Sequence, residues 1–379
     1  MREFVATCLF GLEKQLGEEI DALGLRRLDT MDGRVTFAGE DADIARTNIG
    51  LRCAERVYLK LGAFPARSFT ELFDGVRALP WEDFIGTEDA FPVKGHAVRS
   101  TLFSVPDCQS IIKKAVVERL FSAHGVTGLP EDGTKYQIEF FLFKDIAALM
   151  IDTSGVALHK RGYRPAAGAA PLRETLGAAL ALTARLRPEN LLWDPFCGSG
   201  TIVIEGAMIL RNRAPGLGRH FAAMDYDFLD HRIWARAEEE ARDKERHDVH
   251  PEIFASDTDE KVLTYAKENA TRAGVEDCIR FFRQDARKTA KPAPDRRGTI
   301  ICNPPYGERM MELREVEALY RDIGKTFAAL TPWQIYILTS HERFESLFGR
   351  RADKVRKLYN GMIPCYLYQY FKPPFPKKN

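Results

Sequence analysis

The chain has 379 residues, and its 55 Lys and Arg residues nearly balance 54 Asp and Glu residues, for a formal net charge of +1. The length favours two or three domains, because a domain has roughly 150 residues. The near-neutral charge excludes binding to nucleic acid through overall charge, so any such surface has to be local. With no apolar run of about 18 residues and no signal-peptide pattern, we expect a soluble, cytoplasmic protein without membrane contact.

Residues 1–64 alternate between strand and helix patterns. We expect a strand near residues 4–9, a helix over 11–23, and strands at 35–37 and 56–60 with a helix between them. This order predicts a small α+β domain.

Residues 65–158 form a second predicted α+β domain. Ser68 and Glu71 fit a capping box, which predicts a helix over residues 71–79. We expect strands at 91–98, 136–143 and 147–152, and a helix over 111–121.

The basic, Gly-, Ala- and Pro-rich residues 159–170 predict a linker. From residue 171 to 379, helices alternate with apolar strands, which favours a parallel, doubly wound α/β sheet. The connection between Gly200 and Asp257 is longer than a minimal crossover, so residues 211–249 are expected to form an insertion in this domain. Its charged helical run, 231–246, is most simply a solvated face.

A glycine-rich turn follows the apolar run that ends at Asp194. Gly198 and Gly200 would let the backbone approach a ligand closely, and Asp194 could hold an ammonium group. A phosphate-binding loop would need Gly-Lys before Ser or Thr, and a dinucleotide fingerprint would need a third glycine; neither is present. Asp257 and Asp285 follow two further apolar runs, where they suit ribose hydroxyls and an adenine amino group. For either acid alone, capping the next helix is an equally good interpretation.

Asn303-Pro304-Pro305-Tyr306 follows another apolar run. An exocyclic amino group on a base is a poor nucleophile, because its lone pair is delocalised into the ring. The Asn303 side-chain oxygen and the Pro304 carbonyl could accept its two N–H groups and aim the lone pair at a sulfonium methyl group. Tyr306 could stack on the base. The competing interpretations are an Asx-turn for Asn303 and core packing for Tyr306.

The turn from Asp194 to Thr201 and Asn303-Pro-Pro-Tyr306 resemble the motifs of class I S-adenosylmethionine methyltransferases, in the branch that joins a THUMP RNA-binding domain to the catalytic fold. Arg161-Gly-Tyr-Arg164 and Leu358-Tyr-Asn-Gly-Met362 also resemble this branch. The resemblance implies a ferredoxin-like domain (1–64), a THUMP domain (65–158) and a Rossmann-like methyltransferase domain (171–379). It further implies methylation of guanine N2 in RNA, as in the bacterial enzymes that modify large-subunit ribosomal RNA.

By this resemblance, Asn303, Pro304 and Tyr306 bind the target base. S-adenosylmethionine is the expected cofactor, and its expected contacts are Asp194, Pro195, Phe196, Cys197, Gly198, Ser199, Gly200, Thr201, Asp257, Asp285 and Asn303. No metal is expected, because the seven cysteines form no C-x-x-C pair and have no zinc-like histidine spacing. We expect these cysteines to be reduced and mostly buried.

Structured RNA is the expected partner, and its affinity would have to come from local basic clusters. The best candidates are Lys160, Arg161 and Arg164 in the linker, followed by Lys113 and Lys114 in the THUMP-like segment. Other functions stay open: a transfer RNA substrate, methylation of adenine N6 in DNA or of a protein glutamine, and a non-catalytic factor for ribosome assembly.

Overall fold

The computed structural model describes residues 1–164, 172–306 and 313–371. Residues 165–170 of the predicted linker lie outside the described residues. The chain forms two compact units, and it passes between them several times. The first unit comprises Met1–Thr7, Gly17–Leu158 and Gly216–Glu240; the second comprises Cys8–Leu16, His159–Pro215 and Ala241–Asn379.

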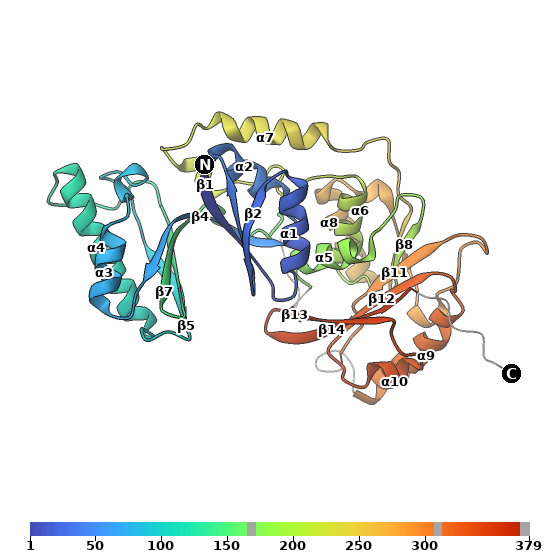
Figure 1. The fold of residues 1–379 in the computed structure, drawn as a ribbon. Helices are drawn as coiled ribbons and strands as arrows, with labels where there is room; N and C mark the ends of the chain where they lie inside the picture. Colours follow the sequence, from blue (N-terminus) through green and yellow to red (C-terminus); the bar gives the residue numbers. More distant parts are fainter. Residues whose placement is uncertain (165–171, 307–312, 372–379) are drawn as a thin grey trace. The chain divides into compact units, whose positions relative to one another are not determined.

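The first unit is built on one seven-stranded sheet with the order β2-β3-β1-β4-β7-β6-β5 (Figure 1). Its strands are β1 (Arg2–Cys8), β2 (Arg26–Met31), β3 (Arg34–Gly39), β4 (Ala54–Pro65), β5 (Val93–Val98), β6 (Ile138–Phe143) and β7 (Ile146–Asp152). Its helices are α1 (Glu13–Ala22), α2 (Asp41–Gly50), α3 (Phe69–Arg77) and α4 (Val105–His124), α1 being shared with the second unit.

The first four strands and two helices follow the β-α-β-β-α-β order of a ferredoxin-like fold. The sequence predicts a domain boundary at residues 64 and 65, but β4 runs through it and pairs with β7. Strands from both predicted N-terminal domains therefore belong to the same sheet. Ser68 caps α3 as predicted, since its hydroxyl accepts a hydrogen bond from the Glu71 N–H.

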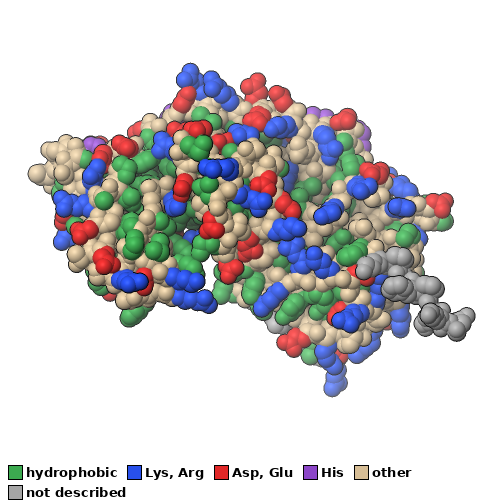
Figure 2. Space-filling model, in the orientation of Figure 1, with side chains coloured by type: hydrophobic (Ala, Val, Ile, Leu, Met, Phe, Trp, Pro, Cys, Tyr) green, Lys and Arg blue, Asp and Glu red, His purple; other side chains and the backbone are tan. Residues whose placement is uncertain are grey.

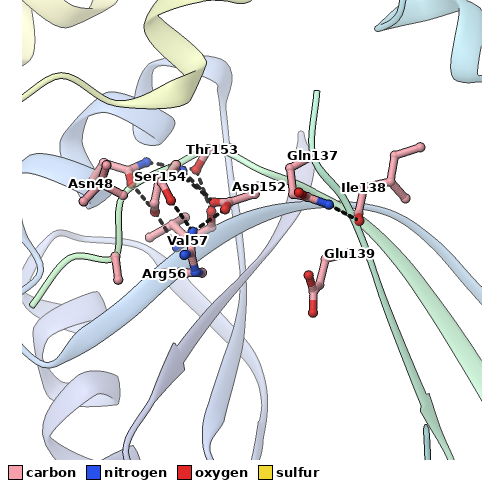
Figure 3. Close-up of polar contacts among 12 residues, drawn as sticks. Asn48, Arg56, Val57, Gln137, Ile138, Glu139, Asp152, Thr153 and Ser154 are labelled. Atoms are coloured by element: carbon pink, nitrogen blue, oxygen red, sulfur yellow. Dashed lines mark hydrogen bonds and ion pairs between the residues drawn. The ribbon is translucent and has the colours of Figure 1, made fainter. Parts of the chain in front are cut away.

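A buried polar network fixes the end of β7 against α2 and β4 (Figure 3). Asn48 donates to Thr153 Oγ1 at 2.9 Å and accepts from the Ser154 hydroxyl at 2.6 Å. Ser154 in turn accepts from the Val57 N–H, and Arg56 forms an ion pair with Asp152. Buried polar groups are costly unless they are paired, so this network favours one packing of the three elements.

Part of the predicted insertion belongs to the first unit. Residues 216–240, including most of α7 (Arg232–Asp243), cluster with the N-terminal strands rather than with the doubly wound sheet. Tyr226 stacks on Tyr136, and Arg46 on α2 forms an ion pair with Glu240 at 3.4 Å. The solvated face expected for this run is therefore only one side of α7, because Ile233, Trp234 and Ala237 on it are buried.

The second unit is a mostly parallel sheet with the order β10-β9-β8-β11-β12-β14-β13. Its strands are β8 (Leu191–Asp194), β9 (Ile253–Asp257), β10 (Ile279–Arg283), β11 (Gly298–Cys302), β12 (Gln334–Thr339), β13 (Lys354–Asn360) and β14 (Ile363–Tyr370). Its helices are α5 (Glu174–Ala184), α6 (Thr201–Leu210), α8 (Glu260–Ala273), α9 (Leu313–Ala328) and α10 (Phe344–Phe348). This confirms the predicted α/β class.

Helices cover the sheet of the second unit on both faces, with α5, α6 and α8 on one side and α9 and α10 on the other (Figure 1). The core under α9 and α10 is rich in aromatic side chains, among them Trp193, Tyr320, Phe327, Phe344 and Tyr368. β14 runs antiparallel to β12 and forms a hairpin with β13, which is an edge strand.

All seven cysteines lie in the described residues and none forms a disulfide bond; all except Cys8 are buried, as the sequence predicts. Over the described part of the chain, none of the helices is long and apolar enough to span a membrane. On the face drawn in Figure 2, basic and acidic side chains are interspersed, in keeping with the balanced composition.

Candidate active site

The site lies where the strand order reverses. β8 has β9 on one side and β11 on the other, and ligands of open parallel sheets bind at such a point, beyond the carboxyl ends of the strands. Trp193 pairs with Ile300 of β11, and Asp194 pairs with Ala255 of β9. Asp194, Asp257 and Asn303 consequently leave three neighbouring strands at the same edge of the sheet.

The turn after β8 is held by its own backbone and by β9. The Cys197 N–H donates to the Ser256 carbonyl at 3.0 Å, and the Gly200 N–H donates to the Cys197 carbonyl at 2.8 Å. Gly198 and Gly200 have φ values of +50° and +86°, which favour glycine. A Cβ built on Gly198 would point into open space, so a ligand can approach its backbone. α6 begins directly after Gly200.

Asp194, at the start of the turn, is buried, with 1 % of its surface exposed. One oxygen accepts a hydrogen bond from the Phe196 N–H at 3.0 Å. Burial raises the pKa of Asp194 well above its usual range, the Phe196 bond opposes this, and the charge of Asp257 adds to it. A cation next to this carboxylate would relieve its unfavourable burial, so the site fits the ammonium group of the expected cofactor.

Asp257 holds the turn from the neighbouring strand. Its Oδ2 accepts from the Gly198 N–H at 3.1 Å, and its Oδ1 accepts from the Asp259 N–H at 3.1 Å. Asp259, not Asp257, caps α8. A carboxylate has about four acceptor positions, so Asp257 retains capacity for ribose hydroxyls.

Asn269 on α8 also supports the turn, and sequence reasoning missed it. Its side-chain amide donates to the Ser199 carbonyl at 3.0 Å, and the residue is buried. The position carries no local sequence signal, since it is simply one polar residue on an amphipathic helix.

Asp285 takes the capping role that the sequence left as its alternative. It accepts from the Arg287 N–H at 2.9 Å at the start of the short 3₁₀ helix Ala286–Lys288, and it forms an ion pair with the Arg287 side chain. This pairing lowers the pKa of Asp285. The contact of Asp285 with adenine stays a prediction. The Arg287 guanidinium would compete with the adenine amino group for this carboxylate.

Asn303 follows β11 directly, and its Oδ1 accepts a hydrogen bond from the Tyr306 hydroxyl. Burial raises the pKa of Tyr306 well above its usual range, with a further contribution from Cys365, so this hydroxyl remains a donor. Cys365 on β14 lies 3.7 Å from the same hydroxyl. The acceptor atom expected for the target amine is thus in contact with the expected stacking residue.

Tyr320, which is fully buried, anchors the loop that follows Asn303. The Tyr320 hydroxyl, on α9, donates to the Pro305 carbonyl at 2.8 Å and lies 2.9 Å from Thr339 Oγ1. Two consecutive prolines leave few N–H groups to anchor such a loop, so a side-chain bond to its carbonyl replaces part of the usual backbone pairing. Sequence reasoning did not single out Tyr320.

The burial of Arg161 and Arg164 argues against the expectation that they bind RNA. Arg161 lies against Glu205 of α6 at 3.4 Å, and both side chains are almost completely buried. Arg164 forms an ion pair with Glu174 at 3.0 Å and donates to Thr201 Oγ1 at 3.0 Å. Removing either cation would leave a buried carboxylate uncompensated, which indicates a structural role beneath the cofactor turn. Lys160 is exposed, and for it the prediction stands.

Lys113 on α4 is also engaged within the protein. It pairs with Glu131, donates to the Phe91 carbonyl at 3.2 Å, and lies over the Phe91 ring. Burial lowers the pKa of Lys113. These contacts argue against a phosphate-binding role, whereas its neighbour Lys114 is well exposed and stays a candidate.

Family models match almost the whole chain. Residues 161–369 match the RMKL-like methyltransferase domain, residues 66–152 match the THUMP domain, and residues 3–58 match the RlmL ferredoxin-like domain. The chain belongs to the RMKL-like methyltransferase family. This membership confirms the expected fold and the expected cofactor, S-adenosylmethionine.

Individual relatives match along almost their full length. "Putative RNA methyltransferase YpsC" of Bacillus subtilis is 42% identical over 99% of this chain and 97% of its own. A "predicted N6-adenine-specific DNA methylase" of Listeria monocytogenes is 43% identical, with a TM-score of 0.93 over 98% of this chain and 96% of its own. "SMU.472, a putative methyltransferase complexed with SAH" is 40% identical, with a TM-score of 0.92 over 99% of both chains.

Within residues 1–164, 172–306 and 313–371, no group of three or more His, Cys, Asp or Glu side chains is arranged to hold a metal ion.

Proposed function

We propose that this methyltransferase transfers the methyl group of S-adenosylmethionine to the exocyclic N2 of a guanosine in large-subunit ribosomal RNA. The observation that carries the proposal is the position of Asn303-Pro-Pro-Tyr306 at the end of β11, directly beside the turn of β8. The reaction needs two neighbouring sites, one for the methyl donor and one for a planar amine, and the two motifs follow neighbouring strands.

In this proposal, one set of residues binds the cofactor and another binds the target amine. Asp194 would hold the cofactor's ammonium group, Asp257 would accept its ribose hydroxyls, and the backbone at Gly198 would allow close approach. When bound, the cofactor supplies an electrophilic methyl group on a sulfonium centre. The Asn303 Oδ1 and the Pro304 carbonyl would accept the two N–H groups of the target amine. Those bonds localise the nitrogen lone pair and orient it, so that no strong general base is required.

For Tyr306 to stack on the base, its hydroxyl would leave Asn303 Oδ1, and the target amine would donate to that oxygen. Once released, the Tyr306 ring can stack on the incoming base, which offsets part of the cost of removing that base from its neighbours. The contact therefore keeps Asn303 hydrogen-bonded in the absence of RNA and frees it when a base enters.

RNA as the substrate class is supported by the THUMP match at residues 66–152 and by the name of the Bacillus subtilis relative. The choice of guanine N2 and of large-subunit ribosomal RNA rests on the motif resemblance. Transfer RNA is the second candidate substrate. Adenine N6 in DNA is a third, because the Listeria monocytogenes relative bears that description and the same Asn303 geometry polarises any planar amine.

The test is methyl transfer from labelled S-adenosylmethionine to ribosomal RNA, transfer RNA and DNA, each purified separately from cells that lack this protein. We expect the label in N2-methylguanosine of large-subunit ribosomal RNA. Label confined to transfer RNA would support the proposed reaction and contradict the proposed substrate. Label in DNA alone, as N6-methyladenine, would overturn the proposal.

A further inference from the structure

The hairpin of β13 and β14 ends in an apolar tip. Met362 is 94% exposed and Ile363 is 38% exposed, and Pro364 beside them is exposed as well. Single exposed apolar residues are ordinary, but three in succession call for a partner. The turn has only two residues, Gly361 and Met362, and the +65° φ of Gly361 suits the first position of a tight hairpin turn.

The tip leads directly into β14, the strand that contacts Tyr306 in the loop after Asn303. Cys365 on β14 lies 3.7 Å from the Tyr306 hydroxyl, and Met362 precedes it by three residues. At about 3.4 Å per residue, the tip lies roughly 10 Å along the strand from Cys365. That is within the reach of a nucleotide next to the one held at Asn303.

The base of the hairpin is anchored on both sides. Leu358 pairs with Cys365, and Asn360 pairs with Ile363. On the other side, Arg356 donates to the Gly11 carbonyl and to Gln15, and Phe10 packs edge-on against Tyr359. A tip supported by paired strands holds its position more precisely than a tip on a loop does.

The charge of the hairpin points to nucleic acid as the partner. Residues 354–371 contain three basic residues and no Asp or Glu. Lys354 and Lys357 are exposed on β13, and Lys357 lies over the Tyr359 ring. A basic edge strand by itself is a common protection against strand pairing. An exposed apolar tip beside such a strand does not serve that protection, because apolar surface promotes the association that edge lysines prevent.

We propose that the Met362 tip is a wedge that enters the base stack of the RNA when the target guanosine leaves it, while Lys354 and Lys357 contact the flanking phosphates. The inference rests on the RNA methylation proposed above. An enzyme acting on a base has to extract it, and apolar side chains such as Met, Leu and Ile serve as wedges between base steps. Tyr306 receives the extracted base, and Met362 occupies the gap that it leaves.

The test compares variants on one RNA in two states. The probe is large-subunit ribosomal RNA from cells that lack the protein, either folded with Mg²⁺ or cut into short fragments and kept unpaired in chelator. Met362→Ser should lower kcat/KM about tenfold or more on folded RNA and less than about threefold on fragments, since unstacking costs a few kcal/mol only where the base is stacked. Met362→Leu should retain activity.

Two controls separate the wedge from other roles. Val355→Ser removes another exposed apolar side chain of the same hairpin. It should leave kcat/KM unchanged on both folded and fragmented RNA. Cofactor affinity, measured by calorimetry, should be the same in all variants. Equal losses on both RNA states, or no loss with Met362→Ser, would overturn the wedge. A dimer of the wild-type protein that Met362→Ser dissociates would also overturn it, because the tip would then be an interface between copies.

The proposed function and the wedge fail in different ways. If the wild-type protein labels no RNA in either state, the proposed function is wrong and the wedge falls with it. If the wild-type protein labels RNA in both states and Met362→Ser labels both states equally well, only the wedge is wrong.

Discussion

The Tyr306 hydroxyl donates a hydrogen bond to Asn303 Oδ1, the atom that we expect to accept an N–H from the target amine. The two residues thus bind each other in the absence of substrate and bind the base together in its presence. Replacing the hydroxyl and replacing the ring should therefore have different effects.

Tyr306→Phe keeps the stacking ring and removes the competing hydroxyl. We expect kcat/KM for RNA to stay equal to that of the wild type or to rise by up to about fivefold, whereas Tyr306→Ala should lower it about 10- to 100-fold through lost stacking. Steady-state kinetics with RNA as the varied substrate measures both. A loss of more than tenfold with Tyr306→Phe would show that the hydroxyl has a direct part in the reaction.

Asn303→Ala removes one of the two expected acceptors for the target amine. Turnover should fall by roughly 10²-fold or more, while cofactor affinity changes little, because the lost bond strengthens only as the reaction proceeds. Single-turnover rates and cofactor titration separate the two effects. Near-normal turnover would contradict the assignment of Asn303.

Tyr320 positions the loop without touching the base. Tyr320→Phe removes the hydrogen bond to the Pro305 carbonyl and should lower kcat about 3- to 10-fold, in line with one hydrogen bond of about 1 kcal/mol. Cofactor affinity and KM for RNA should be unchanged. If thermal stability fell while kcat stayed constant, Tyr320 would be a core residue only.

Asp194 should make cofactor binding depend on pH. Burial raises its pKa in the free protein, and the cofactor's ammonium group favours the ionised form, so binding should release protons. Affinity should consequently fall as the pH drops through the raised pKa of Asp194. Calorimetry in buffers of different ionisation enthalpy measures the protons released. Asp194→Asn should bind weakly and release none; unchanged proton release in this variant would contradict the assignment.

The first unit offers a separate test of pH dependence, through Glu139 (Figure 3). Burial, aided by the charge of Asp152, raises the pKa of Glu139 to about 7, and the nearby cations Arg56, Lys94 and Arg34 oppose the shift. His96 also faces this carboxyl, at 4.0 Å.

Because the folded state holds this proton more tightly than the unfolded state, stability should decrease as the pH rises from about 4.5 through about 7. Glu139→Gln cannot ionise and should escape that loss. After allowance for solvent screening we expect a gain on the order of 1 kcal/mol at pH 8, or about 2–4 °C in Tm, and none near pH 4. Scanning calorimetry at both pH values measures the difference. An equal gain at both would indicate a packing effect.

Local patterns predicted local structure well. Ser68 marked the start of α3, and the apolar runs before Asp194, Asp257 and Asn303 marked three strands of the second unit. Their adjacency at one edge followed from the rule for doubly wound sheets, not from any residue pattern. The helix predicted over 111–121 extends over Val105–His124, because Ser104 and Pro106 begin it earlier.

Long-range pairing could not be read from the sequence. Nothing near residue 64 indicates that β4 pairs with β7, and nothing in residues 216–240 indicates that they pack with the first unit. Arg161 and Arg164 illustrate the same limit, since a basic cluster in a Gly-rich segment has the composition of an exposed RNA-binding linker. Their carboxylate partners, Glu205 and Glu174, are remote in sequence or carry no signal of their own.

The measurement that tests the central claim most directly identifies the atom that receives the methyl group. Wild-type protein and Asn303→Ala are each incubated with S-adenosylmethionine carrying a deuterated methyl group and with total RNA from cells that lack the protein. The RNA is then digested to nucleosides for mass spectrometry. We predict deuterated N2-methylguanosine with the wild type and a loss of roughly 10²-fold or more with the variant. Deuterium in any other nucleoside, or equal labelling by both proteins, would contradict the account.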